Sequence, residues 1–200
     1  MKVERRAYRM ESRAAAMAET RRRLIAATVQ LTTERPFDEV TLEAVATRAG
    51  VTLQTLLRHF GSKPKLVASA ATDAHERVEG QRGQAPVGDP AGAVANLFDH
   101  YEEWGDLAVR LLAQEERFAE IAEMTRKGRA THGAWVARVF APQLARWRSR
   151  ALRARRHLQL VAACDLYVWK LLRRDLHRSR SEAEKVVLGL VEALCAPGGS

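Results

Sequence analysis

Apolar residues recur at spacings of three and four along most of the chain, and this pattern limits it to helices. Leu24, Ala27 and Leu31 follow the spacing near the start, and residues 42–49 repeat it. Residues at these intervals lie on one face of an α-helix, whereas a half-buried strand would alternate at every second residue. The sequence therefore predicts an all-α protein, with no internal repeat.

Capping residues divide the first part of the chain into short helices. Pro36 interrupts the first helix, and Thr41 is a typical N-cap for a second helix over residues 42–49. Gly50 suits the left-handed backbone of a turn, and Thr52 can cap a third helix that runs to residue 59. Ser62, followed by a proline in the first turn, can cap a fourth.

Two short helices joined by a glycine turn are what a helix-turn-helix over residues 41–60 requires. Ala46 and Leu56 would let the helices cross closely, while residues 53–55, 58 and 59 would project outward, where a major groove could receive them. A plain three-helix bundle with a short turn has the same needs. The motif alone therefore leaves both interpretations open.

Basic charge is concentrated near this motif. The chain of 200 residues has a formal net charge of +9, and residues 1–65 hold 13 Lys and Arg against 7 Asp and Glu. Such a charge favours a polyanionic partner, without separating nucleic acid from anionic lipid. Residues 1–19 form a basic arm that either contacts phosphates along a groove or is a frayed, disordered terminus.

A longer window carries a family resemblance. Its marks are Arg-x-x-Leu-x-x-Ala in the first helix, Phe37, the Thr41-Leu42 cap, the Ala49-Gly50-Val51 turn and the run from His59 to Lys63. On these residues, positions 20–68 resemble the N-terminal domain of the TetR family of repressors. The resemblance implies a three-helix helix-turn-helix domain, followed by a larger helical domain for ligand binding and dimerisation.

The resemblance also implies roles for single residues. Thr41 and Thr55 would bond phosphates, and His59 and Lys63 would hold the DNA backbone. Base contacts would then specify the sequence, while phosphate contacts would position the protein. Leu57 stands where the family usually has a tyrosine, which puts a copied contact pattern in doubt. The predicted DNA-binding residues are Thr41, Thr52, Leu53, Gln54, Thr55, Leu57, Arg58, His59 and Lys63.

The second part of the chain is predicted to form further helices. We expect residues 20–78 to form the DNA-binding domain and residues 79–200 the regulatory domain, joined by the loop-forming stretch 80–90. Helices are predicted over about 118–147, 152–177 and 181–195. Candidate ligand contacts are aromatic and polar groups of this part of the chain. The alternative for the aromatic groups is ordinary core packing, and for the polar groups it is a structural hydrogen bond. They are Trp104, Phe118, Met124, His132, Trp135, Asp165 and Trp169.

Two apolar stripes near the end of the chain predict a homodimer. Their spacing suits a four-helix bundle across a two-fold axis, formed by the last two predicted helices of each copy. The expected interface residues are Leu158, Val161, Ala162, Tyr167, Leu171, Val187, Leu190, Val191 and Leu194. A separate cluster of arginines, between Arg146 and Arg156, is interpreted as a solvated turn, with a second DNA surface as the alternative.

Other classes of protein are disfavoured. The sequence holds no glycine-rich phosphate loop, no His-Glu-x-x-His and no Gly-x-Ser-x-Gly, so neither an enzyme nor a metal or cofactor site is predicted. No apolar run approaches the roughly 20 residues of a membrane span, and no secretory signal is recognised, which predicts a cytoplasmic protein.

The sequence thus predicts a ligand-responsive repressor that binds double-stranded DNA at a palindromic operator as a homodimer, with an unidentified, largely apolar effector. Two alternatives remain open. One is a helical protein–protein interaction module with a basic surface, and the other is a DNA-binding dimer without ligand sensing.

Overall fold

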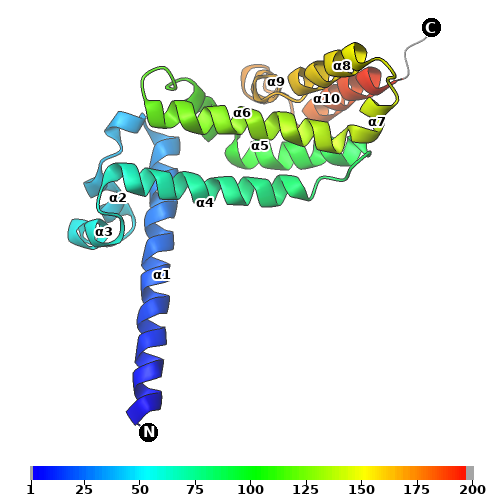
Figure 1. Ribbon diagram of the computed structural model, residues 1–200. Coiled ribbons are helices and arrows are strands. Elements are labelled where there is room, and N and C mark those ends of the chain that lie inside the picture. Colours follow the sequence, from blue (N-terminus) through cyan, green and yellow to red (C-terminus); the bar gives the residue numbers. More distant parts are fainter. Residues whose placement is uncertain (1, 197–200) are drawn as a thin grey trace. The chain divides into compact units, whose positions relative to one another are not determined.

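The computed structural model describes residues 2–196, with side chains at 10 and 12–196, and these residues form helices without a strand. Figure 1 shows the helices in chain order. The contacts divide the chain into two compact units, 1–75 and 76–200, so that the division falls within a helix, between His75 and Glu76. No helix of the described residues is long and apolar enough to span a membrane.

The first unit is built from short helices packed against one long helix. Helix α1 spans Lys2–Glu34, the single-turn η1 spans Phe37–Glu39, α2 spans Leu42–Arg48, and α3 spans Leu53–Phe60. Helix α4, Lys63–Gly83, begins in this unit. Their apolar faces meet in one core, because the spacings of three and four place one buried stripe on each helix. This core contains Leu24, Ile25, Ala27, Leu31, Val40, Val45, Ala46, Ala49, Leu56, Phe60, Leu66 and Ala70.

The second unit contains the end of α4 and the remaining helices. These are α5 (Pro90–Leu112), α6 (Ala119–Val139), α7 (Ala141–Ala145), α8 (Arg150–Ala163), α9 (Leu166–Lys170), the π-helical turn η2 (Leu171–Asp175) and α10 (Arg180–Cys195). Helix α5 lies at the centre and packs against α6, α9 and α10. Its buried face includes Val94, Leu97, Phe98 and Tyr101, which explains why this helix is apolar over more than one side.

Two of the helices predicted for this unit are each divided into shorter ones, near Pro142 and at Asp165. The segment expected at 118–147 ends at Phe140, and Pro142 lies in the first turn of the short α7. The segment expected at 152–177 ends at Cys164, because the Asp165 carboxylate accepts a hydrogen bond from the Tyr167 amide and starts α9. Helix α1 begins at Lys2, within the basic arm, and α4 continues to Gly83, into the stretch that was expected to form a loop.

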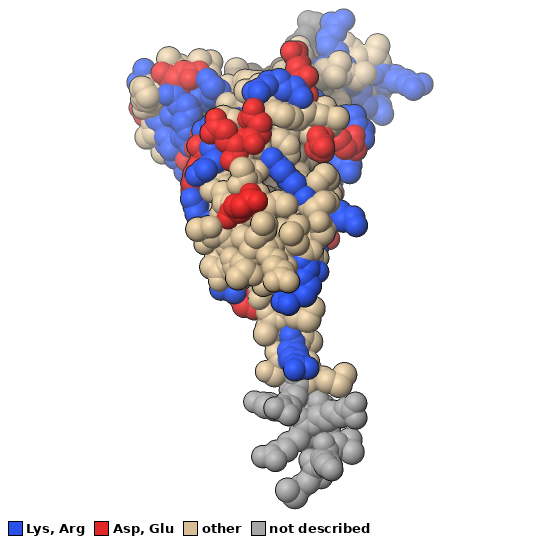
Figure 2. Space-filling view, turned by 90° about the vertical axis from the view of Figure 1, so that its left-hand side faces the viewer, with Lys and Arg blue, Asp and Glu red and all other residues tan. Residues whose placement is uncertain are grey.

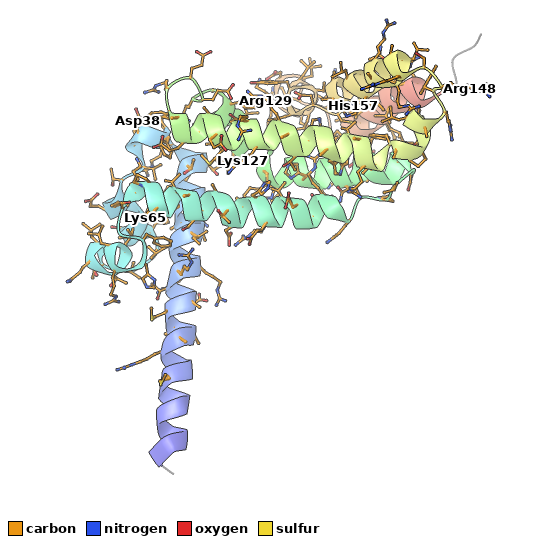
Figure 3. All side chains as sticks on the ribbon, viewed as in Figure 1. Asp38, Lys65, Lys127, Arg129, Arg148 and His157 are labelled. Carbon is orange, nitrogen blue, oxygen red and sulfur yellow. The ribbon has the colours of Figure 1, made fainter. Side chains whose placement is uncertain are left out.

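Three ion pairs join α5 to the C-terminal part of the second unit. Asp99, Glu102 and Asp106 follow one another along α5 at helical spacing and pair with Arg180, Arg173 and Arg174, respectively, with N–O distances of 2.6 to 2.8 Å. Glu102 is the most buried of the three acids and also accepts a hydrogen bond from the Trp169 indole at 3.0 Å. Arg173 holds the pKa of the Glu102 carboxyl below its usual value. A further pair, Arg129 with Glu115, joins α6 to the preceding turn (Figure 3).

Candidate nucleic-acid interface

The turn between α2 and α3 depends on one glycine. Gly50 has φ of 65°, in the left-handed region that side chains disfavour, and its amide donates to the Thr47 carbonyl. The next amide, of Val51, donates to the Ala46 carbonyl at 3.0 Å. These bonds satisfy the end of α2 and turn the chain at once into α3. The predicted helix-turn-helix is therefore present as two helices joined by four residues, 49–52.

Helix α3 presents one apolar and one mostly polar face. Leu56 and Phe60 are buried in the core, whereas Gln54, Leu57 and Arg58 are exposed, Leu57 to 39%. Figure 2 looks from the side on which α3 lies in Figure 1 and shows uncharged side chains over much of the lower front, with both basic and acidic side chains around them. The outward face of α3 thus carries the residue types that read base edges and thymine methyl groups.

Threonine hydroxyls mark the N-termini of both helices. The Thr41 hydroxyl accepts from the Ala44 amide at 3.1 Å, and the Thr52 hydroxyl accepts from the Thr55 amide at 3.2 Å. The Thr52 and Thr55 hydroxyls also lie 3.0 Å apart and share a hydrogen bond. Helix N-termini favour anions, since their amides and dipole point outward. These ends could therefore accept phosphates.

Lys63 is engaged within the protein. Its ammonium donates to the Phe37 carbonyl at 3.0 Å and lies over the Phe37 ring, 4.7 Å from the centroid. This contact fastens the start of α4 to η1. An ammonium has three N–H donors, so Lys63 could bind a phosphate as well as the Phe37 carbonyl. Its bond to η1 nevertheless fixes where the side chain lies. His59 is half-buried and lies beside the Phe60 ring.

Two arginines of α1 lie beside the motif and were not among the predicted contacts. Arg21 covers the Phe60 ring at 4.8 Å, and an Arg23 nitrogen lies 3.9 Å from the place of a β-carbon on Gly50. The run Arg21-Arg22-Arg23 was a visible signal, but only the packing shows which members face the motif. Arg48, by contrast, is bound by Glu34 through two hydrogen bonds of 2.7 Å and holds the pKa of that carboxyl below its usual value.

The candidate ligand residues lie in several parts of the second unit. His132 and Trp135 lie together on α6, and Trp135 lines a groove that is described below. Trp169 is 1% exposed in the core, and Asp165 caps α9. Phe118 precedes α6 under Arg117, while Trp104 and Met124 are half-buried on α5 and α6. The groove's other polar residues, Arg82 above all, were missed, because Arg82 stands in a glycine-rich stretch that was interpreted as a connecting loop.

The candidate interface residues separate into two sets. Val187 and Val191 are 2% and 0% exposed and belong to the core of the second unit, so that they face inward. Val161 and Leu194 are half-buried and pack against the same core. Leu158, Tyr167, Leu171 and Leu190 are exposed to between 46% and 66%, and Ala162 is exposed as well.

The arginine cluster lies where a turn was expected. Arg146 ends α7 and Arg150 begins α8, and both side chains are exposed. Arg153 donates to the Trp147 carbonyl, and Arg156 covers the Trp147 ring at 4.7 Å. These two contacts give part of the cluster a structural role in holding the connection between the helices.

Comparison with known proteins places the first unit. Residues 24–70 match the family model described as bacterial regulatory proteins, tetR family. A stretch of 73 residues is 40% identical to the HTH-type transcriptional repressor KstR of Rhodococcus jostii (strain RHA1), covering 36% of this chain and 34% of that protein. KstR of Mycolicibacterium smegmatis (strain ATCC 700084 / mc(2)155) is 35% identical over 72 residues, which cover 36% of this chain and 35% of that repressor. The match thus spans about a third of the length of these curated relatives.

The fold of the whole chain also has solved counterparts. A transcriptional regulator from Rhodococcus sp. Rha1 superposes with a TM-score of 0.66 over 87% of this chain and 95% of that one, at 20% identity. At this identity the likeness shows a shared helical fold. Together with the capped helices around Gly50, the matches lead to one statement. Over residues 24–70, the N-terminal unit is similar to the tetR family of bacterial regulatory proteins.

Proposed function

We propose that the protein is a transcriptional regulator that binds double-stranded DNA through α3. The observation that carries the proposal is the outward face of this helix. Leu56 and Phe60 anchor the helix in the core, while Gln54 and Arg58 extend from its other side. A helix supported in this way can enter a major groove, where its first residues meet base edges. The Thr41 and Thr52 ends, with Arg21 and Arg23 nearby, supply groups for phosphate contacts.

We further propose that two copies bind a palindromic operator. The exposed apolar side chains Leu158, Tyr167, Leu171 and Leu190 lie on α8, α9, η2 and α10. We propose that they form one apolar patch, which would favour association. A two-fold dimer would present two copies of α3 to half-sites about 34 Å apart. The family includes repressors such as KstR, and repression in the cytoplasm, where bacterial DNA lies, is the proposed outcome.

Ligand control would act through the second unit. A ligand changes DNA affinity only if it binds the DNA-competent arrangement of the dimer with a different affinity from another arrangement. We propose a small organic effector for this role. Its chemical class is the subject of the next subsection.

The experiment first selects bound fragments from the source genome and then measures their affinity by fluorescence anisotropy at several salt concentrations. Arg58→Gln removes a proposed base contact, so its dissociation constant should rise by roughly 5- to 150-fold. Lys127→Gln is the matched control, because Lys127 lies on α6, is 60% exposed and carries the same charge. The control should stay within about twofold of the wild type.

Two results would contradict the proposal. One is an affinity that Arg58→Gln and Lys127→Gln lower equally, since the effect would then come from net charge alone. The other is an affinity that does not fall with rising salt, because neutralised phosphates release counterions on binding.

A further inference from the structure

Arg82 is a buried arginine for which the described residues supply no ion pair. It lies in the last turn of α4, is 4% exposed, and stacks over the Trp135 ring at 4.3 Å. One terminal nitrogen lies 3.2 Å from Nδ1 of His132, and its Nε has no hydrogen-bond partner. Among the described residues, no Asp or Glu pairs with this guanidinium. Buried charges are normally paired, because leaving water costs several kcal/mol.

Two histidines, a tyrosine and a cysteine close to Arg82 are neutral at pH 7. Burial, helped by the charge of Arg82, lowers the pKa of His100 to about 3 and also lowers that of His132, so both imidazoles are uncharged at pH 7. Burial raises the pKa of the Cys164 thiol to about 12 and also raises that of the Tyr101 hydroxyl. The charge of Asp165 acts to raise the pKa values of His132 and Tyr101, but its carboxylate is bonded to the Tyr167 amide, where it caps α9.

Helix ends compensate part of the charge. Arg82 lies at the carboxyl end of its own helix, and the carbonyls of Val161 and Cys164 at the end of α8 bond His132 and Tyr101. The carboxyl end of a helix carries about half of a negative charge. This is less than a full counterion. Nδ1 of His100, which is also buried, lacks a partner as well.

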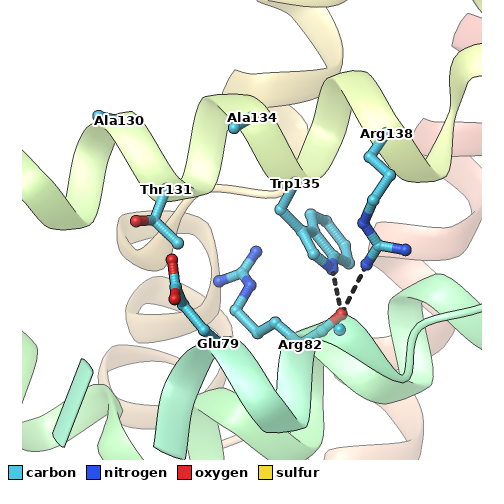
Figure 4. Close-up of a pocket in the computed structure, with 8 residues that line it drawn as sticks. Glu79, Arg82, Ala130, Thr131, Ala134, Trp135 and Arg138 are labelled. Carbon is cyan, nitrogen blue, oxygen red and sulfur yellow. Dashed lines mark hydrogen bonds between the residues drawn. The ribbon is translucent and has the colours of Figure 1, made fainter. Parts of the chain in front are cut away.

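An adjacent groove gives access to this centre. It has a volume of about 510 Å³, within the range of small-molecule sites, and lies between α4 and α6 (Figure 4). Arg82 and Arg138 line it, with Thr131 and Glu79 toward one end. Arg138 donates to the Arg82 and Ala85 carbonyls, which holds its guanidinium at the opposite end from Glu79. Ala130 and Ala134 keep the α6 side low and apolar.

From these observations we infer that the groove binds an organic carboxylate, whose anionic group pairs with Arg82 and whose flat apolar body lies along Ala130 and Ala134 of α6. A planar carboxylate matches the parallel N–H groups of a guanidinium. This inference names the chemical class of the effector and therefore rests on the proposed function. Binding of the carboxylate is nevertheless measured without DNA.

The test compares two probes that differ only in charge. The full-length protein is titrated with 2-naphthoate and with 2-naphthamide at pH 7.5 by calorimetry. The carboxylate should bind at least about tenfold more tightly, since hydrogen bonds to a charged group are the stronger ones. Arg82→Gln should bring the two affinities within about threefold of each other.

Because Arg82→Gln could disturb the buried centre, a second variant leaves it intact. Ala134→Phe fills the groove from an exposed position and should weaken 2-naphthoate at least about tenfold, whereas Ala137→Phe, exposed on the same helix outside the groove lining, should not. Equal affinity for the two probes, binding of neither at millimolar concentration, or full affinity in Ala134→Phe would each overturn the inference.

Selected DNA is titrated in parallel with the same samples. If DNA binds and 2-naphthoate does not, the inference fails and the proposed function stands. If 2-naphthoate binds through Arg82 and no DNA is bound, the proposed function fails while the carboxylate site stands.

Discussion

Gly105 is the point at which α5 and the Trp169 ring approach most closely. A β-carbon there would lie 2.5 Å from two atoms of that ring, which is 1% exposed and therefore cannot swing aside. We expect Gly105→Ala to lower the free energy of unfolding by about 1–3 kcal/mol, as overpacking does. Urea denaturation measures this. The matched control is Gly128→Ala on α6, where nothing lies within 4 Å and alanine should be neutral or stabilise by up to about 1 kcal/mol. Equal effects of the two changes would exclude the close contact.

His100 makes stability depend on pH. Its pKa is lowered to about 3 by burial and by Arg82, while the unfolded chain titrates near the ordinary value of 6.5. Below pH 6.5 the unfolded state therefore binds a proton that the folded state does not, and stability falls with pH. Between pH 8 and pH 5 this one group should cost about 2 kcal/mol of unfolding free energy. Urea denaturation of wild type and His100→Gln at both pH values tests it, because the variant should lose about that much less. An identical loss in both proteins would count against a neutral, buried His100.

At the scale of elements, the turn between α2 and α3 is set by backbone conformation. Gly50→Ala places a side chain at φ of 65°, although it meets only an Arg23 nitrogen at 3.9 Å. The expected loss is about 1–2 kcal/mol of unfolding free energy in the first unit, caused by backbone strain alone. Gly50→Asn should lose less, since asparagine tolerates this region. Thermal unfolding compares the two, and an alanine variant as stable as the wild type would show that the turn can relax.

Helix ends were predictable where a side chain closes the helix by itself. Thr41 and Thr52 cap their helices as the sequence indicates, because each hydroxyl accepts a hydrogen bond from the amide three residues ahead. The breaks at Phe140 and Asp165 were not predicted, because apolar periodicity continues across both positions. The packing of the second unit decides there which short helix follows.

At the scale of the molecule, the exposed apolar residues of α8 to α10 predict association with a second copy. Leu190→Glu would bury an unpaired carboxylate in the proposed interface and should weaken dimerisation at least about tenfold. Light scattering after size exclusion should then report the mass of one 22.3 kDa chain in place of two. Val87→Glu is the control, because Val87 is 54% exposed in the loop before α5. A Leu190→Glu protein that remains dimeric would place the interface elsewhere.

The sequence by itself determined the helical class and the DNA-binding motif. Both depend on local rules, the spacing of apolar residues and the chemistry of caps and turns, which short stretches of chain satisfy alone. Tertiary structure decided which apolar residues of α10 face inward: Val187 and Val191 fill the core, while Leu190 lies at the surface. It also decided that Arg82 is buried beside His132 and Trp135, fifty or more residues away. The burial of a charge depends on which helices pack around it, and residue spacing does not encode that arrangement.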